Sequence, residues 1–428
     1  MNAAGASGRD VKPHHIAGLA AAIERVRVFD QPADATLRAL FRDNRAMGQS
    51  DRAFIAEGAF AYLRRMRSLE ALAQTRDARK LALAVAVREL GHSVRDLGNV
   101  TRAAEAQWLA EFKSRASTEL LPAVAADLPD WLWKRLGDVY GDERRTSLAR
   151  ALLVPAPFDL RANVIKTTRE AALAALRDDD IRVEPTRYAP FGLRVGGRPM
   201  LATHPWLADG RLEVQDEGSQ LIAHLVAPRR TDLVIDFCAG AGGKTLALGA
   251  LMRSLGRLYA FDIVDKRLAN MKPRLARSGL SNVHPELIAH ERDTRIKRLA
   301  GKADRVLVDA PCTGFGTLRR NPDLKWRHAE SSIDELTAKQ TSILAAAAKL
   351  VKPGGRLVYA TCSILPEEND AIVSAFLASH NDFVEGNAAQ DLARANIALD
   401  TGARLRLAPD THGCDGFFAA VLERSKVS

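Results

Sequence analysis

Apolar residues follow three different patterns along the chain. From about residue 11 to residue 153 they recur every three or four positions, as at Ile16, Leu19 and Ile23, which is the period of helices with one buried face. Between residues 155 and 210 short alternating pieces are separated by Pro and Gly, a pattern typical of short strands and turns. Beyond residue 214, continuous apolar runs alternate with segments in which apolar residues recur at helical spacing. We therefore predict an all-α domain (1–153), a small α+β domain (154–213) and an α/β domain (214–428).

Four runs in the last part are apolar at consecutive positions: residues 233–235, 257–260, 306–308 and 357–359. Strands that are apolar on both faces belong to a mostly parallel, doubly wound sheet with helices on each side, a Rossmann-like fold. Ligands of such sheets bind beyond the carboxyl ends of the strands. A polar or reactive residue follows each run, namely Asp236, Asp262, Asp309 and Cys362. We expect the functional site at this edge of the sheet.

Charge and hydropathy narrow the class of protein. Lys and Arg outnumber Asp and Glu by 62 to 52, which gives a net charge of +10 and favours a polyanionic partner such as nucleic acid; solubility alone is the other explanation. The longest apolar stretches, such as residues 343–350, are too short to span a bilayer. The first 15 residues lack the apolar core of a signal peptide. We therefore expect a cytoplasmic protein without a membrane partner.

The four cysteines, at positions 238, 312, 362 and 414, lie far apart in the sequence. They form no C-x-x-C pair and have no histidine at metal-ligand spacing, so we expect no metal site. A cytoplasmic protein is not expected to carry disulfides. The cysteines are therefore buried thiols or reactive thiols.

A glycine-rich loop, residues 236–245 (DFCAGAGGKT), follows the first apolar run. It fails the dinucleotide fingerprint G-x-G-x-x-G, because Thr245 stands where the third glycine should be. Gly243, Lys244 and Thr245 match the end of a phosphate-binding P-loop, but Cys238 stands where its first glycine should be. A P-loop nucleotidase therefore remains an alternative.

The same loop also suits the nucleoside site of a methyltransferase, where it would wrap the methionine part of S-adenosylmethionine. Asp262 follows Gly242 by about twenty residues, the separation at which an acid reaches the ribose hydroxyls in a doubly wound sheet. Taken alone, Asp262 would be a turn residue at a strand end. Together with the loop, it favours the ribose role.

Cys312 and Cys362 both follow strands that end at the predicted ligand edge. One such cysteine would be explained by packing, but two beside a ligand loop favour chemistry. Carbon 5 of a pyrimidine becomes nucleophilic only after a nucleophile adds at carbon 6, and a thiolate supplies that addition. Asp309 is placed to hydrogen-bond or protonate the ring nitrogen as charge builds. This chemistry does not decide which thiol attacks.

The α/β part resembles the NOL/NOP/Sun family of RNA 5-methylcytosine methyltransferases (RsmB/RsmF type) almost from end to end. The matching motifs are residues 214–219, 236–245, 260–262 with Arg267, 309–312, 319–326, 361–369 and 415–418. The resemblance implies that Cys362 is the nucleophile and that Cys312 assists release. It also implies that Lys244 lies at the catalytic centre and that Asp309 contacts the pyrimidine.

The same resemblance implies S-adenosylmethionine as the cofactor. The residues expected to bind it are Cys238, Ala239, Gly240, Ala241, Gly242, Gly243, Lys244, Asp262, Arg267, Asp293 and Asp309, with Asp293 on the adenine side. The chain departs from the family at Gly240-Ala241, where Ala-Pro is usual. Loss of that proline should loosen the loop and weaken cofactor binding without abolishing it.

RNA contacts are expected at Arg319, Arg320, Lys325 and Trp326, which combine cations with an aromatic ring just past the catalytic loop. Packing is an equal alternative for Trp326. The N-terminal helices resemble the NusB-type domain of bacterial small-subunit rRNA methyltransferases, and residues 155–210 resemble the RNA-contacting domain of those enzymes. We expect a monomer that acts on 16S rRNA or a small-subunit precursor; a catalytically inactive RNA-binding assembly factor is the non-enzymatic alternative.

Overall fold

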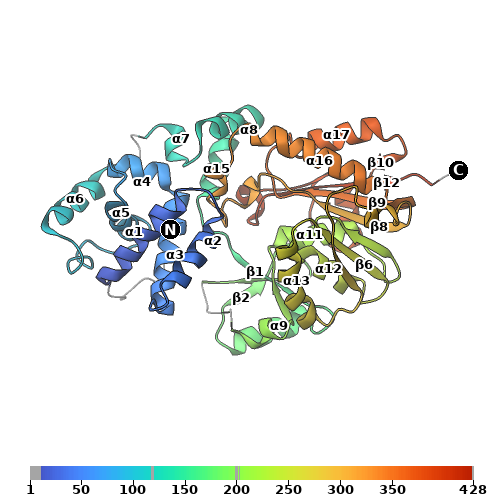
Figure 1. The fold of residues 1–428 in the computed structure, drawn as a ribbon, viewed down its shortest axis with the longest axis horizontal. Helices are drawn as coiled ribbons and strands as arrows, with labels where there is room; N and C mark the ends of the chain where they lie inside the picture. Colours follow the sequence, from blue (N-terminus) through green and yellow to red (C-terminus); the bar gives the residue numbers. More distant parts are fainter. Residues whose placement is uncertain (1–10, 117–119, 198–200, 202, 427–428) are drawn as a thin grey trace. The chain divides into compact units, whose positions relative to one another are not determined.

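The computed structural model describes residues 11–116, 120–197, 201 and 203–426 (Figure 1). The chain forms two compact units. One consists of the chain up to Pro155 together with Thr317–Glu330, and the other of Ala156–Gly316 with the chain from Ser331 onward. The described part of the chain contains no helix that is long and apolar enough to cross a membrane.

The first unit is helical, as predicted. Ile16, Leu19 and Ile23 are fully buried, so the apolar face expected from their spacing does face the core. Within the core, α1 packs against α3 and α5. The helices of this unit are α1 (Pro13–Val26), α2 (Ala33–Asp43), α3 (Gln49–Arg64), α4 (Met66–Ala73), α5 (Ala78–Arg88), α6 (Ala103–Ser114), α7 (Pro122–Ala125), α8 (Asp130–Leu152) and the distant α15 (Leu324–Arg327).

Residues 317–330 belong to this helical unit although they come from the middle of the α/β sequence. The indole Nε1 of Trp326 donates to the carbonyl of Leu63 at 3.0 Å, and the Nζ of Lys325 donates to the carbonyl of Arg64 at 2.9 Å. The sequence pattern assigned this segment to the α/β domain. It could not show the true location, because the partners lie more than 250 residues away in the chain.

The second unit contains a large sheet in the order β10-β12-β9-β8-β5-β6-β7, with β11 beside β12. Strands β9, β8, β5, β6 and β7 are parallel, and β12 runs antiparallel to β9. The predicted Rossmann-like class is confirmed. The strands are β5 (Leu233–Asp236), β6 (Arg257–Asp262), β7 (Val283–Leu287), β8 (Ala303–Asp309), β9 (Val351–Thr361), β10 (Phe383–Glu385), β11 (Leu405–Leu407) and β12 (Phe417–Arg424).

Helices cover both faces of this sheet, which explains the continuous apolar runs. Val234 and Leu307 pack with residues of α11, α12 and α13, whereas their neighbours Ile235 and Val306 pack with residues of α16 and α17. Successive residues of a strand point to opposite faces, so each run needs apolar side chains throughout. The helices are α11 (Glu217–Val226), α12 (Gly243–Leu251), α13 (Asp265–Ser278), α14 (Thr294–Lys297), α16 (Ser332–Ala348), α17 (Asp370–Ser379), α18 (Ala388–Arg394) and α19 (Pro409–His412).

A small antiparallel sheet, in the order β2-β3-β1-β4, is part of the same compact unit as the large sheet. Sequence reasoning predicted it as a separate domain. Its elements are β1 (Phe158–Ala162), α9 (Arg169–Asp178), β2 (Val183–Pro185), β3 (Gly192–Val195), α10 (Pro205–Ala208) and β4 (Leu212–Val214).

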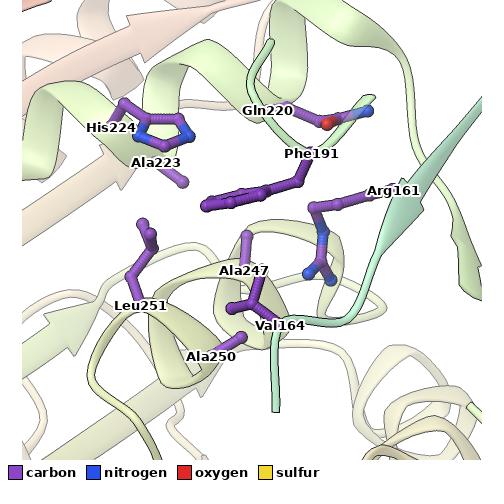
Figure 2. A pocket seen from close by; sticks show the side chains of 9 residues that line it. All are labelled: Arg161, Val164, Phe191, Gln220, Ala223, His224, Ala247, Ala250 and Leu251. Carbon is purple, nitrogen blue, oxygen red and sulfur yellow. The ribbon is translucent and has the colours of Figure 1, made fainter. Parts of the chain in front are cut away.

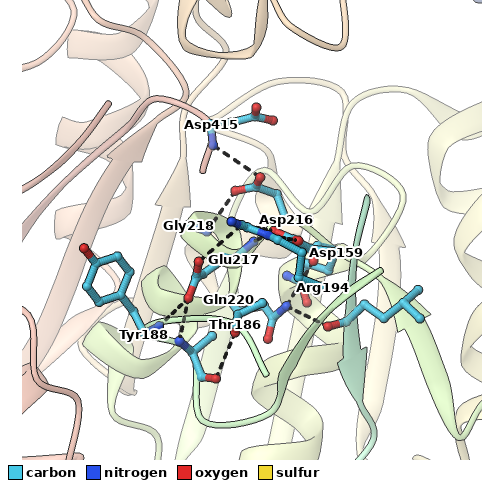
Figure 3. A network of polar contacts seen from close by, with 12 residues as sticks. Asp159, Thr186, Tyr188, Arg194, Asp216, Glu217, Gly218, Gln220 and Asp415 are labelled. Carbon is cyan, nitrogen blue, oxygen red and sulfur yellow. Dashed lines mark hydrogen bonds and ion pairs between the residues drawn. The ribbon is translucent and has the colours of Figure 1, made fainter. Parts of the chain in front are cut away.

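A buried polar network joins this small sheet to α11 (Figure 3). Arg194 of β3 makes two hydrogen bonds to Asp159 of β1, at 2.8 and 2.9 Å. The side chain of Glu217 accepts the backbone amides of Tyr188 and Ala189. Asp159 and Glu217 have fully buried side chains, and buried carboxylates are stable only when hydrogen-bonded in this way. The network therefore fixes the small sheet against the first helix of the α/β fold.

A small cavity lies between the small sheet and helices α11 and α12 (Figure 2). Its polar lining consists of Arg161, Gln220 and His224, and the rest is apolar. Burial, with a contribution from Arg161, lowers the pKa of His224 to about 4, so this imidazole is neutral at pH 7. None of the residues predicted to bind cofactor or RNA lines this cavity.

Candidate active site

Four strand ends bring the predicted reactive residues to one edge of the large sheet. Asp236 at the end of β5 is in register with Ala260 of β6 and Leu307 of β8. Asp309 at the end of β8 is in register with Ala360 of β9, two residues before Cys362. Because all these strands are parallel, the acids and thiols emerge on the same side.

The glycine-rich loop between β5 and α12 is held in a tight turn by hydrogen bonds. The amide of Ala239 donates to the carbonyl of Phe261 at 2.9 Å, and the amide of Gly240 donates to Asp262 Oδ2 at 2.8 Å. Gly242 has a φ of +86°, and a Cβ there would lie 2.6 Å from Met271 Cγ, so only glycine fits. The loop can therefore bring its backbone close to a ligand.

The departure at Ala241 has a compensating contact in this chain. The guanidinium of Arg274, on α13, donates to the carbonyl of Ala241 at 2.6 Å. Arg274 is itself held by two hydrogen bonds to Glu213, at 2.9 and 3.1 Å. This contact restrains the loop at the position where the family usually has proline; the weaker cofactor binding expected there stays a prediction.

Asp262, for which a ribose contact is predicted, lies buried beside the glycine-rich loop. Its side chain is 3% exposed, and its oxygens accept the amides of Gly240 and Val264, both at 2.8 Å. Arg267 forms a longer ion pair with it at 3.8 Å. A carboxylate offers about four lone-pair sites, so acceptor capacity remains for ribose hydroxyls. A Cβ added at Gly240 or at Gly243 would have no atom of a non-neighbouring residue within 4 Å, so the backbone of the loop is open to a ligand at both positions. The residues of this edge therefore fit S-adenosylmethionine.

Asp293 has a structural function in addition to any contact with adenine. Its two oxygens accept the amides of Arg295 at 2.9 Å and Ala289 at 3.0 Å, which caps α14. These backbone hydrogen bonds lower the pKa of its carboxyl. The predicted adenine contact stays a prediction.

The two predicted catalytic thiols lie in contact, with their Sγ atoms 3.4 Å apart. The hydrogen bond with Cys362, together with burial, raises the pKa of the Cys312 thiol. Cys312 therefore keeps its proton and can donate it toward Cys362. By contrast, burial raises the pKa of Cys238, and Cys414 is fully buried, so neither of these thiols is suited to nucleophilic attack.

Lys244 supplies a buried positive charge to this centre. Its Nζ donates to Asp309 Oδ2 at 2.7 Å and lies 5.3 Å from the centre of the Phe417 ring. Burial alone would lower the pKa of Lys244, but the charges of Asp309 and Cys362 outweigh burial and raise it. Lys244 is therefore cationic at neutral pH and brings a positive charge beside Asp309 at the edge where the two thiols lie.

The motif at residues 415–418 supports the loop that follows Cys312. Gly416 and Gly316 approach so closely that a Cβ on Gly316 would lie 2.1 Å from the carbonyl oxygen of Gly416. The amide of Gly316 donates to the carbonyl of Cys362 at 2.9 Å, and the amide of Gly416 donates to the carbonyl of Gly316 at 2.8 Å. Both glycines are therefore required by this close backbone contact.

The residues predicted to contact RNA have other partners in the structure. Lys325 is 2% exposed, and burial lowers its pKa to about 7. Trp326 packs against the core of the helical unit. Both side chains therefore pack within the helical unit, and an RNA contact by either of them stays a prediction. Arg319 is buried, and its carbonyl accepts a hydrogen bond from Arg64. Arg320 is half-buried and keeps its predicted role as an expectation.

Sequence reasoning missed a cluster of buried polar side chains around the two cysteine loops. The cluster contains Thr313, Gln340, Ser363 and Glu368, and each of these residues is at most 2% exposed. The sequence offered one signal for this cluster: a residue with a hydroxyl group directly follows each of the two predicted catalytic cysteines, Thr313 after Cys312 and Ser363 after Cys362. Glu368 lies within the matching motif at residues 361–369. Its position at the centre of the cluster could not be predicted, because its partners include Thr313 and Gln340, which lie 55 and 28 residues away.

The chain is similar to known rRNA methyltransferases. A model of the 16S rRNA methyltransferase RsmB/F matches residues 223–423, and a model of the ferredoxin-like domain of such methyltransferases matches residues 128–199. The probable ribosomal RNA small subunit methyltransferase B of Synechocystis sp. is 34% identical over 301 residues, which cover 69% of this chain and 67% of the relative. The protein belongs to the RsmB/RsmF family of rRNA methyltransferases.

Other family members and solved structures extend this likeness. The ribosomal RNA small subunit methyltransferase B of Sodalis glossinidius is 33% identical over 316 residues, which cover 73% of this chain and 70% of the relative. The crystal structure of PH0851 has a TM-score of 0.77 and 25% identity and covers 97% of this chain and all of that one. NSun6 from Pyrococcus horikoshii, solved with SFG, shares the fold with a TM-score of 0.62 and 20% identity, over 70% of this chain and 99% of that one.

Proposed function

We propose that this protein transfers a methyl group from S-adenosylmethionine to carbon 5 of a cytosine in 16S rRNA, through a covalent adduct between Cys362 and carbon 6. The observation that carries the proposal is the contact between the Cys312 and Cys362 thiols, 3.4 Å apart, at the sheet edge that holds Lys244 and Asp309. Family relatives named as small-subunit rRNA methyltransferases support the choice of RNA. SFG, an analogue of S-adenosylmethionine, in the NSun6 structure supports the choice of cofactor.

The residues of the chain would divide the reaction between them. The Cys362 thiolate would add to carbon 6 and form an S–C bond, and the electron pair of the ring double bond would move toward carbon 5. Asp309 hydrogen-bonds the ring as charge builds there. S-adenosylmethionine supplies the methyl group that carbon 5 accepts. The carbon 5 proton then passes to a solvent base, its C–H electron pair re-forms the double bond between carbons 5 and 6, and the S–C bond breaks so that Cys362 leaves as a thiolate. The Cys312 thiol, which keeps its own proton, would assist this release by donating a hydrogen bond to the departing sulfur.

Replacement of the two thiols should have opposite effects on the adduct. Cys362→Ala should abolish methyl transfer, because the adduct cannot form. Cys312→Ala should accumulate protein–RNA adducts, because release is slowed. The measurement is transfer of tritiated methyl to 16S rRNA, with denaturing gels for adducts and mass spectrometry to locate 5-methylcytosine.

Cys414→Ala is the matched control, since Cys414 is a buried thiol outside the pair; it should leave transfer near the wild-type rate. Full activity of Cys362→Ala would overturn the role given to that thiol. Tight RNA binding without methyl transfer to any rRNA would favour an inactive assembly factor. Binding of ATP with magnesium, in place of S-adenosylmethionine, would favour a nucleotidase.

A further inference from the structure

Glu368 lies between the two cysteine loops and touches both. Its carboxylate accepts the amide of Thr313 at 2.8 Å and the hydroxyl of Thr313 at 2.5 Å. It also accepts the hydroxyl of Ser363 and, at 3.1 Å, the Nε2 of Gln340. Thr313 directly follows Cys312 and Ser363 directly follows Cys362. One side chain therefore connects the residues next to both thiols.

Glu368 is itself held firmly. It is fully buried, and the hydroxyl of Tyr359, on β9, donates to its backbone carbonyl at 2.7 Å. Gln340, on α16, donates both to Glu368 and to the carbonyl of Pro311 at 2.9 Å, so it restrains the first cysteine loop from a second side. Glu368 is thus anchored to the sheet through its backbone carbonyl and to helix α16 through its carboxylate.

The energetics of this cluster explain why it can fix a geometry. A buried carboxylate is strongly unfavourable unless its lone pairs are filled, and hydrogen bonds to a charged acceptor are about twice as strong as neutral ones. The four donors come from the loop after Cys312, the loop after Cys362 and helix α16. A shift of one loop relative to the other would break at least one of these bonds.

We propose that Glu368 is a positioning residue that holds the Sγ atoms of Cys312 and Cys362 in contact. The catalytic consequence of this contact rests on the proposed function, whereas the geometry does not. Misplacement of reacting groups by about 1 Å can lower a rate on the order of 100-fold. In addition, the pKa of Cys312 is raised first by the hydrogen bond with Cys362, then by burial and the charge of Cys362, and after these by the charge of Glu368.

The test is Glu368→Gln, which preserves shape but replaces one oxygen acceptor by an amide and removes the charge. We expect kcat for methyl transfer to fall about 100-fold, with KM for S-adenosylmethionine within about twofold of the wild type. The direct readout of geometry is the rate at which diamide, a two-electron thiol oxidant, converts the two thiols to a Cys312–Cys362 disulfide, measured by peptide mass spectrometry. Diamide takes up both thiol protons and both electrons. This rate should fall at least about fivefold, because the effective concentration of one thiol at the other drops.

Glu217→Gln is the matched control. Glu217 is also a fully buried carboxylate of the same compact unit, but its partners are the amides of Tyr188 and Ala189 and the side chain of Arg194. It should lower Tm about as much as Glu368→Gln and leave the disulfide rate at the wild-type value. The milder variants Thr313→Val and Ser363→Ala remove one hydroxyl each, and they provide the same test if Glu368→Gln does not fold.

A disulfide rate in Glu368→Gln, or in the two milder variants, equal to or above that of the wild type would overturn the proposal. A slower rate in a protein that methylates no RNA even as the wild type would support the positioning role and overturn the proposed function instead. A slower rate together with a lower kcat supports both.

Discussion

At the scale of single residues, Asp236 is the unusual group of the cofactor edge. It is fully buried at the end of β5. Its Oδ2 accepts the hydroxyl of Thr245 at 2.7 Å, and within the described chain its Oδ1 has no hydrogen-bond partner. Burial raises its pKa to about 7. Near neutral pH this carboxyl is therefore partly protonated, and it can donate as well as accept a hydrogen bond.

Asp236→Asn should change how stability depends on pH. The pKa is about 7 in the folded state and about 3.9 in an unfolded chain, so the folded state binds the proton more tightly. The stabilisation is fully present below about pH 4 and is lost as the pH rises through about 7. The Tm of the wild type should therefore fall relative to that of Asp236→Asn between pH 5 and pH 8, as measured by scanning calorimetry. A difference in Tm that does not vary with pH would contradict this.

The positions of the reactive residues were predictable because each stands at the end of a strand. A short apolar run in the sequence predicts the strand, and with it the residue that follows at the ligand edge. Asp236, Asp262, Asp309 and Cys362 belong to this class. Glu368 was not predictable, because its neighbours are set by the pairing of β8 with β9. The attack and release roles of the thiols came from resemblance to a family, since the chemistry of two adjacent thiols is symmetrical.

At the scale of elements, the segment that contains α15 packs in a way that its sequence did not indicate. Its cations and aromatic ring suggested an RNA surface, but the same composition also suits a buried anchor, because Lys and Trp have apolar bodies with polar ends. Burial of Lys325 and the hydrogen bond from Trp326 to Leu63 show that this segment is anchored on the helical unit. Only the tertiary partners in α3 distinguish the two cases.

Trp326→Ala should therefore destabilise the helical unit by about 3 kcal/mol, at the lower end for an aromatic residue removed from a core, because Trp326 is partly exposed. Urea unfolding followed by circular dichroism measures the change. Asn321→Ala, at an exposed position of the same segment, should change stability by less than about 0.5 kcal/mol. Equal stability of the two variants would show that Trp326 is not an anchor.

At the scale of the whole molecule, the chain enters each unit twice. It leaves the α/β unit after Gly316, adds residues 317–330 to the helical unit, and returns at Ser331. The all-α, α+β and α/β order was readable from periodicity. The return of the chain to the helical unit at residues 317–330 could not be predicted. The sequence of a short segment with its own turn and helix does not indicate which unit the segment packs against.

A shortened protein without residues 1–155 should consequently be defective even though it keeps every predicted catalytic residue. Trp326 would lose the carbonyl of Leu63, and Asp323 would lose the amide of Ala33 that it accepts at 3.3 Å. We expect less than about a tenth of wild-type methyl transfer and rapid proteolysis within residues 317–330, since a segment without packing partners opens readily. Wild-type activity with a protease-resistant segment would contradict this.

The split helical unit also determines the order in which it can be completed during synthesis. The carbonyls of Leu63 and Arg64 leave the ribosome long before Trp326 and Lys325, whose side chains they accept. At ordinary elongation rates, roughly 10 to 35 s separate the end of the first segment from the arrival of the second. During that interval the core of the nascent helices lacks the side chain of Trp326, which packs against it in the finished unit, so this unit can be completed only late in translation.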